Sequence, residues 1–98
     1  MDTSATLRAT VAVLMHATGE TQKTLAGVLG MAQPGVSRRM RPDGSGCPWT
    51  LADLDRLSAH YAIPVVDLIA GPDAALRRLA PERRAATIGG RQTMIAAA

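Results

Sequence analysis

The chain has 98 residues, and eleven lysines or arginines against eight acidic residues give it a formal net charge of +3. This length predicts one domain with a tail, and a single cysteine, Cys47, excludes a disulfide within the chain. The sequence has no apolar run near the roughly 18 residues of a membrane span, and its first residues lack the layout of a signal peptide. We therefore expect a cytoplasmic protein without a membrane partner.

Apolar residues at helical spacing predict a first helix over residues 4–18. The residues expected along its buried side are Leu7, Val11, Leu14 and Met15. Ser4 or Thr3 can cap the start of this helix, and Gly19 ends it.

Two short helices are predicted next, separated by a turn at Gly30. One side of the helix over residues 21–29 carries Leu25, Ala26, Val28 and Leu29. Gly30 suits the left-handed end of that helix, and Pro34 suits the first turn of the following one. In the second helix Val36 would face inward, and the side chains expected to face outward are Gln33, Ser37, Arg38 and Arg41. Two helices joined in this way form a helix-turn-helix, whose second helix fits the major groove of DNA.

Residues 42–48, PDGSGCP, are predicted to form a loop because they contain Asp-Gly and Ser-Gly pairs. This loop either runs beside the DNA backbone or is a flexible connector. Thr50 is expected to cap the next helix in a weak capping box with Asp53. Trp49 precedes the cap and is placed to fold back onto the side of the helix that carries Leu54.

The next two predicted helices complete the apolar core. The stripe of the first consists of Leu51, Leu54, Leu57 and Tyr61, and the second contributes Ile63, Val65, Leu68 and Ile69. The pair Gly71-Pro72 breaks the chain after the fifth helix.

These segments resemble the Cro/cI-type (XRE) helix-turn-helix family. The four residues that occupy its typical positions are Gln22, Ala26, Gly30 and Val36, and GMAQPGVS resembles the matching segment of phage repressors. Residues 50–69 are similar to the fourth and fifth helices of the family, with Pro64 where Ser is more common. The resemblance covers residues 5–70 and implies an all-α, five-helix, lambda-repressor-like DNA-binding domain over residues 1–71.

The resemblance also implies roles for individual residues. The base-reading positions of the family correspond to Gln33, Pro34, Ser37 and Arg38. The implied phosphate contacts are Thr21, Gln22, Lys23, Arg39 and Arg41, and the core of the motif consists of Ala26, Gly30 and Val36. Gln33 can bond adenine and Arg38 can bond guanine, whereas Pro34 offers only apolar contact.

Arg39 departs from the family, which usually has a large apolar residue at this position. Either the stem of Arg39 covers the core with its head at a phosphate, or Met40 takes the inward position.

Residues 72–98 are expected to form an extension, with short helical turns interrupted by Pro81. The runs around Gly89-Gly90 fit either a hairpin or a frayed tail. The apolar residues without an evident place in a five-helix core include Leu76, Leu79, Ile88 and Ile95. We therefore expect this segment to pair with a second copy of the chain, the alternative being a disordered basic arm that follows DNA.

No group of residues in the sequence supports catalysis, so we expect neither an enzyme nor a cofactor. His16 and His60 are isolated and predict no metal site, Asp53 and Asp55 look solvated, and Cys47 is interpreted as a free thiol. The expected function is a sequence-specific transcriptional regulator, a small dimeric repressor that binds double-stranded DNA and occludes an operator. The alternatives are a protein-interaction module, such as an antitoxin or anti-repressor, and an architectural or excision-type DNA binder.

Overall fold

The computed structural model describes residues 2–41 and 46–84, which form six α-helices and one short 3-10 helix and contain no strand. In chain order the elements are α1 (Thr3–Thr18), α2 (Gln22–Leu29), α3 (Gln33–Arg39), α4 (Leu51–Tyr61), α5 (Val65–Ala70), α6 (Pro72–Arg78) and η1 (Pro81–Arg83). The prediction of an all-α chain is therefore confirmed for these residues. No helix among them is long and apolar enough to cross a membrane.

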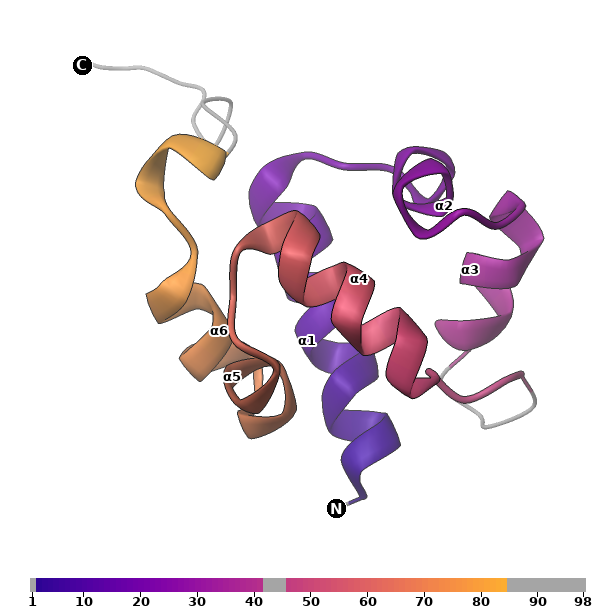
Figure 1. Ribbon diagram of the computed structural model, residues 1–98, viewed down its shortest axis with the longest axis horizontal. Coiled ribbons are helices and arrows are strands. Elements are labelled where there is room, and N and C mark those ends of the chain that lie inside the picture. The colour runs from indigo at the N-terminus through magenta and orange to yellow at the C-terminus, as the bar shows by residue number, and fades with distance from the viewer. Residues whose placement is uncertain (1, 42–45, 85–98) are drawn as a thin grey trace.

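Helix α1 lies at the centre of the molecule, with α5 and α6 packed against it and α2 and α3 on the other side (Figure 1). Helix α4 joins the two sides because it contacts both α2 and α5. The core is aliphatic apart from one fully buried aromatic ring, and its largest buried side chains are Tyr61, Leu14, Leu25, Leu29, Leu57, Ile63 and Leu68. Burying this apolar surface is the main favourable contribution to folding.

The helix boundaries follow local capping chemistry. Asp2 caps α1, since its carboxylate accepts the amide hydrogen of Ala5 at 2.7 Å, so the prediction of Ser4 or Thr3 as the cap is wrong. The predicted cap of α4 is confirmed, because Thr50 and Asp53 form a complete capping box.

Three residues that were expected in the core are exposed, and one of them is Ile69, on α5, which is 39% exposed. Leu51 is 80% exposed. It is the first residue of α4, and the buried residues of that helix begin two positions later, at Asp53. Val28, on α2, is 40% exposed, whereas the neighbouring Leu25 and Leu29 are fully buried. On these helices, fewer of the apolar residues face the core than their spacing predicted.

Helix α6 is part of the same core, which corrects the prediction that the leucines after residue 71 have no place in it. Gly71 has a φ of 126°, which L side chains rarely adopt, and the chain turns there to bring α6 back onto α1. Leu79 is only 4% exposed, and Leu76 is partly buried against the core. Ile88, Ile95 and the expected hairpin around Gly89-Gly90 lie outside the described residues.

Candidate nucleic-acid interface

Helices α2 and α3 pack against each other across a tight turn. Gly30, in the left-handed conformation with φ 69°, ends α2, and the amide of Met31 donates to the carbonyl of Ala26 at 3.0 Å. Ala26 is 3% exposed and Val36 is fully buried. The small side chain of Ala26 therefore lets α3 pack close to α2, and Val36 fills space in the core.

The outer surface of α3 carries the side chains that the sequence assigned to base contacts. Gln33, Pro34 and Arg38 are exposed and Ser37 is half-buried. Because residues four apart share one side of a helix, Gln33 lies beside Ser37 and Pro34 lies beside Arg38. Pro34 stands in the first turn of the helix, as predicted. The exposed side of α3 therefore combines amide, hydroxyl and guanidinium groups.

Gln22, the first residue of α2, and Gln33, the first residue of α3, are hydrogen-bonded to each other. The side-chain amide of Gln33 donates to the carbonyl oxygen of Gln22 at 2.8 Å. Each glutamine keeps unused groups, since Gln22 retains its NH2 and Gln33 retains its carbonyl oxygen and a second N–H. The bond orders two long side chains at the exposed junction of the two helices while leaving both able to bind a partner.

The other residues assigned to phosphate contacts differ in whether their side-chain polar groups already have a partner within the protein. Thr21 caps α2, since its hydroxyl oxygen accepts the amide hydrogen of Thr24 at 3.1 Å. Lys23 and Arg41 are exposed and form no ion pair with the rest of the described chain. Thr21, Lys23 and Arg41 thus keep their side chains at the surface beside α2 and α3.

Arg39 is used inside the protein, which corrects its assignment as a phosphate contact. Its Nε donates to the carboxylate of Asp53 at 2.7 Å, and its guanidinium lies 6.0 Å from the centre of the Trp49 ring. Another guanidinium nitrogen donates to the carbonyl of Gly35 at 3.2 Å. Met40 also packs against the core. The guanidinium of Arg39 therefore ties the end of α3 to the start of α4.

Asp53 is buried, so the prediction that it is solvated is wrong. Burial raises the pKa of its carboxyl group, but hydrogen bonds from the Thr50 amide and from Arg39 outweigh this and hold the pKa below its ordinary value. The carboxylate is therefore ionised at neutral pH, where it serves both the helix cap and the guanidinium.

A second link joins α2 to α4. A guanidinium nitrogen of Arg56, on α4, donates to the carbonyl of Leu29 at 3.0 Å. Leu29 is the last residue of α2, where helix carbonyls lack partners within the helix. Both short helices are thus fixed to the same longer helix, and the exposed side of α3 is held in one orientation.

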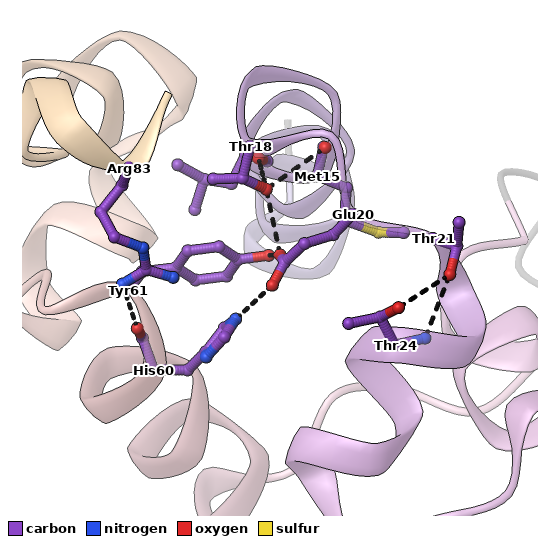
Figure 2. Close-up of polar contacts among 9 residues, drawn as sticks. Met15, Thr18, Glu20, Thr21, Thr24, His60, Tyr61 and Arg83 are labelled. Carbon is purple, nitrogen blue, oxygen red and sulfur yellow. Dashed lines mark hydrogen bonds and ion pairs between the residues drawn. The ribbon is translucent and has the colours of Figure 1, made fainter. Parts of the chain in front are cut away.

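Behind α2, the carboxylate of Glu20 is the centre of a polar cluster (Figure 2). The hydroxyl of Tyr61 donates to it at 2.6 Å, the ring of His60 lies 2.5 Å from it, and Thr18 donates at 3.1 Å. His60 is therefore not isolated, contrary to the sequence interpretation. Arg83, in η1, donates to the carbonyl of His60 at 2.6 Å. The cluster joins the connection between α1 and α2 to the end of α4 and to η1.

The contacts in this cluster shift two pKa values in opposite directions. For Glu20, burial raises the pKa, but hydrogen bonds from Tyr61 and His60 outweigh it and leave the pKa lowered. For Tyr61, burial and the neighbouring Glu20 carboxylate raise the pKa. At neutral pH a carboxylate therefore accepts a hydrogen bond from a neutral phenol.

Comparison of the chain with protein-family models, with curated proteins and with solved structures finds no match. Across residues 2–41 and 46–84, no group of three or more potential metal ligands is found.

The sequence interpretation missed the residues that hold α3 in place. Arg39 and Asp53 are 14 positions apart, and Arg56 and Leu29 are 27 positions apart. The spacing of Thr50 and Asp53 did indicate a capping box, but no local pattern indicated that the same carboxylate would pair with an arginine on another helix.

Proposed function

We propose that this chain is a sequence-specific, cytoplasmic DNA-binding regulator that places α3 in the major groove of double-stranded DNA. The single observation that carries the proposal is the hydrogen-bonded pair Gln22 and Gln33 at the exposed junction of two tightly packed helices. An ordered glutamine at the start of a helix that fits the major groove is suited to base contacts, because its amide can form hydrogen bonds with N6 and N7 of the same adenine.

The other exposed groups fit the same arrangement. Arg38, one turn along α3 from Pro34, suits the O6 and N7 atoms of guanine, and Pro34 suits a thymine methyl group. Ser37 can bond either kind of base edge. Gln22 can donate from its unused NH2 group to a phosphate, as can Lys23 from its ammonium group. The polar side of α3 would then read sequence while the start of α2 positions the duplex.

Helix α3 has only seven residues, so one copy of the chain reaches few base pairs. We therefore propose a homodimer on two half-sites, with major grooves one helical turn apart, which would repress transcription by occluding RNA polymerase. Resemblance to the Cro/cI-type family over residues 5–70 supports this proposal.

The proposal is tested by selecting bound sites from random DNA with the purified protein and then measuring variants on the selected site. Gln33→Ala should weaken binding to that site by about 1–3 kcal/mol and binding to random DNA much less, because Gln33 contacts bases. Lys23→Gln is the matched control and should weaken both by the same factor. A selection that enriches no sequence would contradict the proposal.

A further inference from the structure

A pocket of about 400 Å³ lies beside α3, and Arg38 is the one residue with a proposed base contact among the described residues that line it. It is formed by the start of α1, the end of α3 and residues 46–48. Three arginines line it, namely Arg8 on α1, Arg38 in the last turn of α3 and Arg41, two residues after the end of α3. We refer to the pocket lined by these three arginines as the basic pocket.

The basic pocket has an excess of positive charge. None of its three arginines pairs with an acid elsewhere in residues 2–41 and 46–84. Among the described residues that line it, Asp2 is the one acid, and one of its carboxylate oxygens already accepts the amide hydrogen of Ala5. Three guanidinium charges against one carboxylate leave a concave surface that attracts anions and concentrates them.

The start of α1 adds to this attraction. Thr3 and Ser4 line the pocket and belong to the first turn of a 16-residue helix. Asp2 accepts the amide hydrogens of Ala5 and Thr6, whereas the amides of Thr3 and Ser4 have no acceptor within the helix, and the helix dipole favours negative charge at this end. A guanidinium group, free N–H groups and a concave shape together suit a tetrahedral oxyanion.

We propose that the basic pocket binds a phosphate group and that the DNA backbone beside the major groove supplies it. This inference rests on the proposed function, because Arg38 and Arg41 connect the pocket to the helix assigned to the groove. Arg8 then provides a backbone contact from α1, a helix to which the sequence assigned no DNA contact. Arg38 lines the pocket and also carries a proposed base contact, so the test is made at Arg8.

The first test compares Arg8→Gln with the parent protein on DNA at several salt concentrations. The variant should lower the slope of log affinity against log salt by about one unit and weaken the selected site and random DNA equally. Arg77→Gln is the matched control, because Arg77 is an exposed arginine on α6 that does not line the pocket. A slope in Arg8→Gln equal to that of the parent overturns the assignment to the DNA backbone.

A second measurement separates the two sources of phosphate. Melting of the DNA-free protein is followed in inorganic phosphate and in chloride of equal ionic strength. Phosphate should raise the melting temperature of the parent and not that of Arg8→Gln, because a ligand stabilises only the state that binds it. A phosphate effect with an unchanged salt slope would make free phosphate the ligand, and the absence of both overturns the proposal. If the parent binds no DNA, the proposed function fails and melting alone decides whether the pocket binds phosphate.

A third measurement changes the charge in the pocket without replacing an arginine. Cys47, the only cysteine, is exposed and lines the pocket. Thiosulfonate reagents can attach either a sulfonatoethyl or a trimethylammonioethyl group of similar size to it. The anionic adduct should weaken DNA binding several-fold more than the cationic one. In Cys47→Ser, treatment with either reagent should leave the affinity for DNA unchanged. Equal effects of the two adducts contradict a phosphate in this pocket.

Discussion

Arg39 occupies a position where an apolar side chain would serve the core, and its guanidinium instead joins α3 to α4. The bond to Asp53 is 2.7 Å long, and the two side chains are 16% and 3% exposed. A charged pair this far from water contributes little unless its remaining groups are satisfied. Here the guanidinium of Arg39 also donates to the carbonyl of Gly35, and the carboxylate of Asp53 also accepts the amide hydrogen of Thr50. The pair therefore fixes the direction of α3 more than it adds to stability.

Asp53→Ala should lower the free energy of unfolding by about 1–3 kcal/mol, because it leaves Arg39 and the Thr50 amide without an acceptor. Asp55→Ala is the matched control on the same helix. The side chain of Asp55 is exposed and has no ion-pair partner among the described residues, so its loss should change stability by less than about 0.5 kcal/mol. Chemical denaturation measures both, and equal midpoints would contradict the role given to Asp53.

The same substitution should change the response to acid. The lowered pKa of Asp53 contributes stability that is present above the ordinary carboxyl pKa of about 3.9 and is lost as the pH falls through the lower folded-state value. Glu20, whose pKa is also lowered, loses its contribution in a similar range. Between about pH 5 and pH 2, Asp53→Ala should therefore lose less stability than the parent, although not all of the acid sensitivity should disappear.

At the scale of the helices, the sequence predicted what is local. Thr50 and Asp53 are three positions apart, and the glycines that end α1 and α2 directly follow the helices they terminate. The pairing of Glu20 with His60 was not predictable, because 40 positions separate them and each looks like an ordinary surface residue in its own segment. Leu51 was predicted to be buried but is exposed. The apolar spacing places it in line with Leu54, but the spacing does not show that the first residue of α4 lies outside the core.

The close crossing of α2 and α3 gives a prediction at this scale. Ala26→Leu should cost about 1–3 kcal/mol of stability, because a larger side chain at a residue 3% exposed must displace α3. The adjacent Gly27→Ala provides the control, since a β-carbon there meets nothing within 4 Å. Replacing this exposed helical glycine should stabilise the protein by roughly 0.5–1 kcal/mol. Thermal melting distinguishes the two, and a stable Ala26→Leu variant would mean that α2 and α3 do not cross closely at this residue.

For the whole molecule, the important difference from the predicted boundaries is where the folded unit ends. Residues 72–84 contribute α6 and η1, and both are attached to the core, η1 through the bond from Arg83 to the carbonyl of His60. A boundary at residue 71 was favoured because Gly71-Pro72 has the composition of a break. The pair does end α5, but the chain reverses there and continues in the same domain. Any pairing between copies through Ile88 and Ile95 stays a prediction.

Two truncations test this boundary together with the proposed pairing. A chain ending at Gly71 loses the buried Ala75 and Leu79 and the contacts of Arg83, so its free energy of unfolding should fall by about 2–4 kcal/mol. A chain ending at Arg84 keeps α6 and η1 and should unfold at a higher denaturant concentration than the chain ending at Gly71. Sedimentation of the chain ending at Arg84 and of the full chain then isolates residues 85–98: a dimer only in the full chain assigns pairing to that segment. Equal stability of all three chains would contradict the placement of α6 in the core, because removing a buried leucine cannot leave the folded state unchanged.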